Sequence, residues 1–230
     1  MGLFISFEGG EGAGKSTQAA LLTTQLQEEG HAVVSVREPG GTPLGEKIRP
    51  WVKGVEMTPQ TELLLFAAAR AQLVATVIGP SLQAGKVVIA DRFADSTTAY
   101  QGYGRGLPLD LVRAANQVAT GGVMPDLTFL LDQPAEQGLQ RIGEAQLGLP
   151  LGDDEAPGNS PGRMDDAAQS KFEQQDLAFH RKVRSGFLKL AGEEPHRILV
   201  MDAAKLEAEI AEAVWQRVGA RLRGTPASAL

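Results

Sequence analysis

The stretch EGGEGAGKST, residues 8–17, follows a short apolar run and precedes a segment with helical spacing. Its residues Gly9, Gly14, Lys15 and Ser16 match the pattern G-x-x-x-x-G-K-[ST] between a strand and a helix. Glycine tolerates the left-handed backbone conformations that turn peptide N–H groups inward, and the following helix directs its positive end at an anion. The stretch therefore predicts a phosphate-binding loop; a chance glycine-rich turn is the alternative.

This loop predicts binding of a nucleoside triphosphate. We expect Lys15 to reach the β- and γ-phosphates, and the Ser16 hydroxyl to face Mg²⁺. The residues expected to line the triphosphate are Gly10, Glu11, Gly12, Ala13, Gly14, Lys15, Ser16 and Thr17. The loop does not identify the acceptor, because GTPases, motor ATPases and small-molecule kinases all share it.

Apolar runs alternate with helical patterns along the rest of the chain. Strands are expected at residues 3–8, 32–37, 86–91, 126–132 and 196–202, and helices include 17–30, 59–85 with a bend at Pro80, and 206–222. Alternation of this kind predicts an α/β fold with a parallel sheet covered by helices on both faces. Ligands are then expected at the carboxyl ends of the strands. We expect one domain over residues 1–223 and a flexible tail at 224–230.

Residues 143–162 interrupt this alternation. The segment is rich in glycine, proline and acidic residues and contains no lysine or arginine. It predicts either a lid over the active site, at about 142–164, or a disordered surface insertion. Its acidic run, Asp153, Asp154 and Glu155, is expected to be a solvated turn, with a second Mg²⁺ site as the alternative.

The composition excludes several classes of protein. The chain has 230 residues, no cysteine and a formal net charge of -6. We found no apolar run of the roughly 18–20 residues that a membrane span needs, and no signal peptide pattern. The negative charge argues against a broad nucleic-acid surface. We therefore expect a cytoplasmic protein with no nucleic-acid or membrane partner.

Three further stretches bear on the acceptor: REPGGT at 37–42, LLFAAARAQ at 64–72 and DRFADSTTAYQG at 91–102. With these, the chain resembles the thymidylate kinase family over roughly residues 3–222. The resemblance implies a three-layer P-loop fold with a five-stranded parallel sheet and a lid, transfer of phosphate from ATP to dTMP, a requirement for Mg²⁺, and a homodimer. Two alternatives stay open: a kinase for another pyrimidine monophosphate, and a nucleotide-dependent switch.

The resemblance also implies an acceptor site. Phe66 and Arg70 lie four positions apart on one helix face, where the resemblance implies stacking on thymine and binding of the dTMP phosphate; core packing and a surface ion pair are the alternatives. Tyr100 is expected to exclude a ribose 2′-OH. The residues expected to bind dTMP are Glu11, Glu38, Pro39, Phe66, Arg70, Arg92, Ser96, Tyr100 and Gln101.

Phosphoryl transfer depends on converging cations more than on covalent chemistry. The guanidinium of Arg92 suits a phosphate bidentately, and Asp91 is expected beside Mg²⁺ with Ser16; a local Asp91–Arg92 pair is the alternative. The resemblance implies that Glu11 lies near the acceptor 3′-OH or a Mg²⁺-bound water, with a solvated side chain as the alternative.

The loop itself offers no arginine, because Gly12 and Ala13 follow Glu11. The resemblance therefore implies a lid arginine, and Arg141 and Arg163 flank the predicted lid. The expected catalytic residues are Lys15, Asp91, Arg92, Arg141 and Arg163. The three histidines, His31, His180 and His196, have no ligand spacing and are expected to be structural or exposed.

Overall fold

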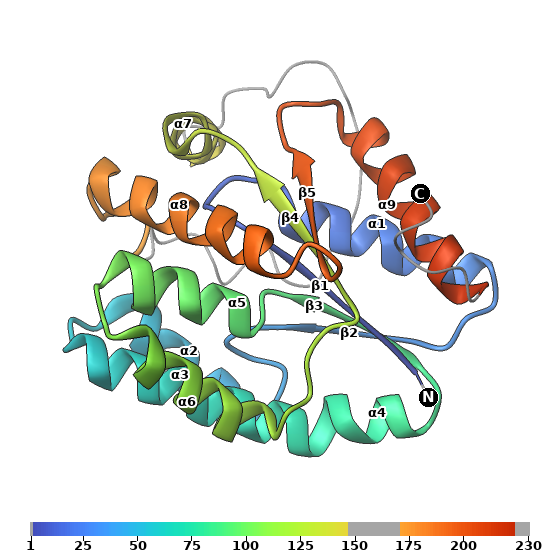
Figure 1. The fold of residues 1–230 in the computed structure, drawn as a ribbon, viewed down its shortest axis with the longest axis horizontal. Coiled ribbons are helices and arrows are strands. Elements are labelled where there is room, and N and C mark those ends of the chain that lie inside the picture. The colour runs from blue at the N-terminus through green and yellow to red at the C-terminus, as the bar shows by residue number, and fades with distance from the viewer. Residues whose placement is uncertain (1, 147–170, 224–230) are drawn as a thin grey trace.

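The computed structural model describes residues 2–146 and 171–223. Its core is one parallel sheet with strand order β2-β3-β1-β4-β5 (Figure 1). The strands are β1 (Leu3–Gly9), β2 (Val33–Arg37), β3 (Val87–Asp91), β4 (Leu127–Asp132) and β5 (Ile198–Asp202). All five lie where the apolar runs predicted them, so the predicted fold class is confirmed.

The helices connect these strands and cover both faces of the sheet (Figure 1). They are α1 (Lys15–Glu28), α2 (Pro43–Gly54), α3 (Pro59–Leu73), the π-helical η1 (Val74–Ile78), α4 (Gly79–Gln83), α5 (Ala94–Thr97), the π-helical η2 (Thr98–Gly104), α6 (Leu109–Thr120), α7 (Ala135–Gln146), α8 (Leu177–Glu193) and α9 (Glu207–Leu222). The sequence pattern had assigned no helix specifically to α2 or to the α5–η2 segment.

Strand β1 is buried on both faces. Because successive side chains of a strand point to opposite faces, Ile5 and Phe7 pack toward α1 and α9. Phe4 instead contacts the ring of Phe93 and belongs to the cluster that includes Leu73 of α3. The central strand is thereby held from both sides, which fixes the loop at its carboxyl end.

The helical run from α3 to α4 is continuous but changes to the π-helical η1 just before Pro80, so the predicted bend at Pro80 stays a prediction. The Gly79 N–H donates to the Val74 carbonyl, five residues back, so the turn before the proline is widened. The run Pro59–Gln83 is long and apolar enough to cross a membrane by length and composition alone. It packs against α2 and α6, however, and carries the buried, ion-paired side chains of Glu62 and Arg70. We interpret it as a core helix.

The predicted lid falls only partly within the described residues. Residues 142–146 continue α7. Residues 147–164, including Arg163 and the acidic run at 153–155, lie outside the described residues, as does the predicted tail at 224–230. The lid, the tail and the domain bounds therefore stay predictions.

Candidate functional site

The glycine-rich loop lies between β1 and α1, at the carboxyl edge of the sheet. Gly9, Gly12 and Gly14 all have positive φ angles, of 141°, 67° and 84°. Gly14 is the N-cap of α1 in the left-handed conformation, which an L side chain rarely adopts. The local geometry is thus the one that a phosphate-binding loop requires.

Lys15 is buried within this loop. Its Nζ atom donates to the Gly10 carbonyl over 2.6 Å. Burial, together with the nearby charge of Arg92, lowers the pKa of Lys15 to about 8, although Glu11 opposes the change. A desolvated ammonium group of this kind gains strongly from an anionic partner, because little water competes for it.

Helix α7 approaches the loop so closely that neither contact position can carry a side chain. A Cβ atom on Gly12 would lie 2.2 Å from the carbonyl oxygen of Gly138, and one on Gly138 would lie 2.2 Å from the carbonyl oxygen of Glu11. An arginine at position 12 is therefore excluded by the backbone of α7, in addition to being absent from the sequence.

Ser16, in the first turn of α1, meets Asp91, the last residue of β3. The Ser16 hydroxyl donates to an Asp91 carboxylate oxygen. These are hard oxygen donors, which suit Mg²⁺, and a Mg²⁺ ion commonly keeps several waters and takes only one or two protein ligands. The two residues can hold this ion together with the phosphates of a bound nucleotide.

Arg92 connects the loop to the segment that follows β3. Its backbone has φ 70°, the only positive φ of a non-glycine among residues 2–146 and 171–223, a conformation that costs about 1–2 kcal/mol. Its side chain donates to the Gly9 carbonyl (3.0 Å), the Ser96 hydroxyl (3.2 Å) and the Glu11 carboxylate (2.9 Å). Its guanidinium also lies over the Tyr100 ring.

Glu11 accepts hydrogen bonds from Arg92 and from the Tyr100 hydroxyl, the latter over 2.7 Å. Burial alone would raise the pKa of Glu11, but the positive charges of Arg92 and Lys15 lower it to about 2. Glu11 is therefore a carboxylate at neutral pH. It is held in place rather than freely solvated, which was the alternative considered from the sequence.

A second carboxyl group, that of Glu8, binds the segment that follows β3. It accepts hydrogen bonds from the Phe93 N–H (2.8 Å), the Ser96 N–H (3.3 Å) and the Ser96 hydroxyl. Burial and the negative charge of Asp95 raise the pKa of Glu8 to about 8. Ser96 thus lies between Glu8 and Arg92 and positions the arginine.

Arg70 is only 1% exposed, so it does not form the surface ion pair that was the alternative considered from the sequence. Its guanidinium donates to the Glu38 carboxylate over 2.6–3.1 Å, and also to Asn116, Thr97 and the Phe93 carbonyl. The arginine therefore joins α3 to the REPGGT segment, whose Glu38–Pro39 peptide bond is cis. The contact of Arg70 with a phosphate stays a prediction.

The predicted base-binding residues gather around a set of aromatic rings. Phe172 lies 6.1 Å from Phe66 and 5.7 Å from Tyr100, measured between ring centroids. Phe66 is only partly buried and packs against the small core cluster formed by Ile48, Val52 and Ala69. Phe66 therefore packs against the core, and its partly exposed ring can also stack on a bound base.

Arg141 lies on α7 but not against the loop residues. Its Nη1 atom donates to the Ala203 carbonyl, after β5, over 3.2 Å. Within the described parts of the chain, no hydrogen bond or ion pair joins it to Lys15, Glu11 or Arg92.

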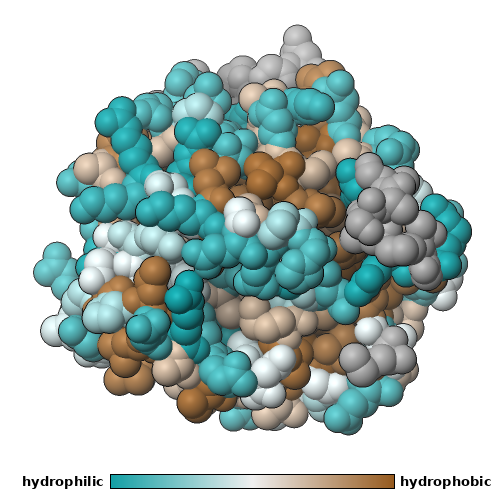
Figure 2. Space-filling view, viewed as in Figure 1, coloured by the Kyte–Doolittle hydropathy of each residue, from teal (hydrophilic) through white to brown (hydrophobic). Residues whose placement is uncertain are grey.

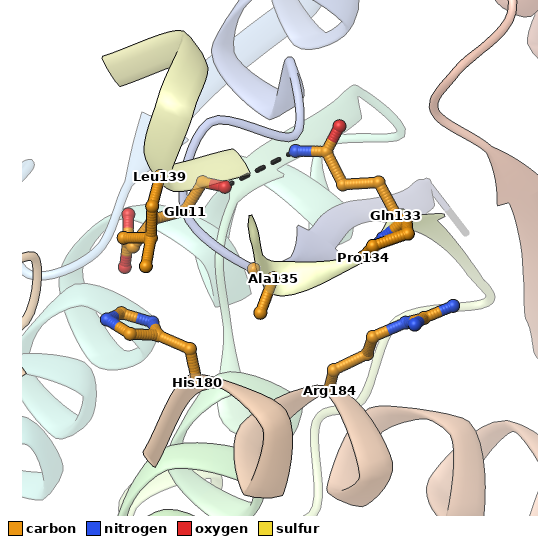
Figure 3. Close-up of a pocket in the computed structure, with 8 residues that line it drawn as sticks. Glu11, Gln133, Pro134, Ala135, Leu139, His180 and Arg184 are labelled. Carbon is orange, nitrogen blue, oxygen red and sulfur yellow. Dashed lines mark hydrogen bonds between the residues drawn. The ribbon is translucent and has the colours of Figure 1, made fainter. Parts of the chain in front are cut away.

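A pocket lies between the loop, the start of α7 and α8 (Figure 3). Its lining includes Glu11, Gln133, His180 and Arg184. His180 is buried, and its Nε2 atom has no hydrogen-bond partner among the described residues. Arg184 donates bidentately to Asp132 at 2.8 and 2.9 Å. Figure 3 shows His180 and Glu11 on the same side of this pocket.

The sequence analysis did not identify the residues that hold the site segments in place at the carboxyl edge of the sheet. They are Glu62, Asp95, Thr97, Asn116, Gln133, Arg184 and Arg197. A partial signal existed: Asp132, the partner of Arg184, is the last residue of β4, and Asp95 and Thr97 fall inside the DRFADSTTAYQG motif. Glu62, Arg184 and Arg197 lie on helices or turns with no motif to mark their partners.

Comparisons with known proteins agree with this geometry. Residues 7–214 match the family model described as thymidylate kinase. The chain is 49% identical to a thymidylate kinase of Synechococcus sp. (strain JA-3-3Ab), with 96% of this chain and 97% of the relative covered. It is 48% identical to one of Deinococcus radiodurans, covering 96% and 98%. It is also similar to the crystal structure of thymidylate kinase from Ehrlichia chaffeensis, with a TM-score of 0.70, 32% identity, and coverage of 94% and 98%.

We expect Gly12→Ala to destabilise the protein by about 2 kcal/mol or more, because the methyl group meets the Gly138 carbonyl at a backbone position with positive φ. Urea unfolding measures this change. Gly10→Ala is the matched control, since a Cβ atom there meets nothing within 4 Å. Equal stability of the two variants would contradict the close packing of α7 on the loop.

The raised pKa of Glu8 predicts a pH-dependent stability. The unfolded chain releases this proton near the ordinary pKa of 4.5, whereas the folded protein keeps it up to about 8. The stabilisation is therefore complete below about pH 4.5 and is lost as the pH rises toward 8. Glu8→Gln mimics the neutral carboxyl group and removes this titration. The Tm of the wild type should fall relative to that of the variant across this range; a constant difference would contradict the shift.

Proposed function

The chain belongs to the thymidylate kinase family, and we propose from this premise how its own residues perform the reaction. The enzyme phosphorylates dTMP to dTDP. We propose ATP as the donor and Mg²⁺ as the metal ion. The observation that carries the proposal is the position of Arg92, which contacts both the glycine-rich loop and Glu11 and Ser96 beside it.

The donor phosphates bind at the glycine-rich loop in this proposal. The main-chain N–H groups and Lys15 hold the β- and γ-phosphates, and Ser16 and Asp91 hold Mg²⁺. Support comes from the left-handed glycines, from the desolvated ammonium group of Lys15, and from the Ser16–Asp91 hydrogen bond. When bound there, Mg²⁺ would neutralise part of the negative charge of the phosphates.

The acceptor dTMP lies on the other side of Arg92. Its phosphate faces the Arg92 guanidinium, and its sugar faces Glu11 and Tyr100, which are already hydrogen-bonded to each other. Because the acceptor is a phosphate anion, no general base is needed, and the role of the protein is to bring two anions together. Phe66 and Gln101 are proposed at the base.

Arg70 takes a different role in this proposal from the one expected. Its hydrogen bonds to Glu38, Thr97 and Asn116 leave it engaged with three separate segments. We therefore propose that Arg70 positions the loop at Glu38 and Pro39 against the acceptor, rather than contacting the dTMP phosphate as a free cation.

An arginine near the lid supplies additional charge to the transferred phosphoryl group, with Arg141 and Arg163 as candidates. We expect at least one of Arg141→Ala and Arg163→Ala to slow single-turnover transfer, by up to about 10³-fold if the arginine acts like an arginine finger. Quench-flow measurement with saturating ATP and dTMP reports this rate. If neither substitution slows transfer, the lid-arginine proposal is wrong.

We also propose a cytoplasmic homodimer. Large apolar side chains are exposed on three neighbouring helices, including Trp51 of α2, Leu64 of α3 (64% exposed) and Val118 of α6 (84% exposed). In Figure 2, hydrophobic residues interrupt the hydrophilic surface at the lower left, where these helices lie in Figure 1. A second copy of the chain would cover this face, and light scattering of the purified protein would report twice the mass of the chain.

The direct test of the function is phosphate transfer from ATP to a panel of acceptors: dTMP, dUMP, UMP, CMP and AMP. We expect dTMP to have the highest kcat/KM, and its addition to stimulate ATP turnover strongly. A higher kcat/KM for CMP or UMP would favour another pyrimidine kinase. Slow ATP hydrolysis that no acceptor stimulates would favour a nucleotide-dependent switch.

A further inference from the structure

Glu62 is a buried carboxylate on α3 that joins three segments of the chain. Its side chain is 1% exposed. It accepts hydrogen bonds from Gln101 Nε2 over 2.8 Å and from Arg105 Nε and Nη2 over 3.2 and 3.3 Å. Lys171 Nζ lies 2.9 Å from its second oxygen. Two cations therefore balance this buried charge, which would otherwise be costly to desolvate.

The charge of Glu62 decides how the Gln101 side chain is oriented. A carboxamide has two faces of nearly the same shape, one with two N–H donors and one with a carbonyl acceptor. An ionised carboxylate can only accept hydrogen bonds. Gln101 must therefore direct its NH₂ group at Glu62, because the reverse orientation would place oxygen against oxygen.

The carbonyl oxygen of Gln101 consequently points away from Glu62. It receives no hydrogen bond within the part of the chain that the structure describes. Among the described residues, three side-chain atoms are fully buried and have no hydrogen-bond partner: Gln18 Oε1, Gln133 Oε1 and His180 Nε2. The Gln101 carbonyl oxygen is not one of them, so it is not fully buried. Gln101 as a whole is only 1% exposed. The small area that stays accessible therefore includes this oxygen.

Gln101 also lies beside the aromatic rings proposed for the acceptor base. Tyr100 is its neighbour in η2, and Arg105, the other partner of Glu62, lies over the ring of Phe172 at 5.6 Å. Phe172 in turn contacts Phe66. The accessible carbonyl oxygen thus belongs to the same region as the proposed stacking residues.

We propose that Glu62 is a positioning residue for specificity: it holds the Gln101 amide so that the Gln101 carbonyl oxygen accepts the N3–H of the acceptor pyrimidine. Thymine and uracil carry a hydrogen on N3, whereas neutral cytosine has an acceptor lone pair there. The fixed amide therefore selects the first two bases and repels the third. This inference rests on the proposed position of Gln101 at the dTMP base.

The first test is Glu62→Gln. A glutamine at position 62 can offer either a donor or an acceptor, so Gln101 becomes free to reverse. We expect the ratio of kcat/KM for dTMP over dCMP to fall by about tenfold or more, because a buried hydrogen-bond match is lost. An unchanged ratio would overturn the role of Glu62. Lys171→Gln is the matched control: it removes a charge from the same carboxylate but leaves the Glu62–Gln101 pair intact, so the ratio should stay constant.

An exchanged pair separates this role from a loss of folding. Gln101→Glu alone places two carboxylates together and should abolish use of dTMP. In the double variant Glu62→Gln/Gln101→Glu, the new amide at position 62 donates to the new carboxylate at position 101. The other oxygen of that carboxylate still accepts N3–H, so the preference for dTMP should return. A double variant that folds, as judged by its thermal transition, and shows no preference would contradict the proposal. If the wild type does not phosphorylate dTMP, the proposed function itself is wrong. That outcome differs from a wild type that uses dTMP and a variant that keeps its preference, which would contradict only the role of Glu62.

Discussion

The hydrogen bonds of the Arg92 side chain are the interaction on which the rest of the active-site edge depends. They tie the end of β3 to the backbone of Gly9, to Glu11 within the glycine-rich loop, and to Ser96 in the next helix. The left-handed backbone of Arg92 is unfavourable by itself. It is held by the hydrogen bond from its N–H to the Phe7 carbonyl and by the buried Glu8 beneath it. Strain at this position is therefore offset by the bonds that direct the guanidinium at the site.

Buried ion pairs hold the segments around this centre. Arg70 pairs with Glu38, Arg197 with Asp95, and Glu62 with Arg105 and Lys171. Each pair links elements that are distant in sequence, and each contains a group that would be strongly destabilising without its partner. These pairs add little to the net free energy of folding compared with apolar packing, but their geometry specifies one arrangement of the binding segments. Substrate groups then meet side chains that already have fixed positions.

Much of the fold and the donor half of the site could be predicted from the sequence. Five apolar runs became the five strands, because each lies in a parallel sheet that helices cover on both faces. Gly14, Lys15 and Ser16 act through local backbone geometry, so a short motif specifies them. The acceptor half was harder. Phe66, Arg70 and Gln101 were proposed through resemblance. Asn116 and Glu62 were missed, and Glu38 was predicted but not as the partner of Arg70. These partners come from separate segments, and no local pattern pairs them.

The sequence by itself determined the positions of the strands, the phosphate-binding loop and the absence of an arginine within it, since these depend on residue type and near-neighbour spacing. Only the tertiary structure decided that Arg70 pairs with Glu38 in the interior, that Gly12 packs against Gly138, and that Gln101 donates a hydrogen bond to Glu62. The physical reason is the same in each case. Such contacts form when helices and strands pack on one another, and their energies depend on distance and burial, which spacing along the chain does not encode.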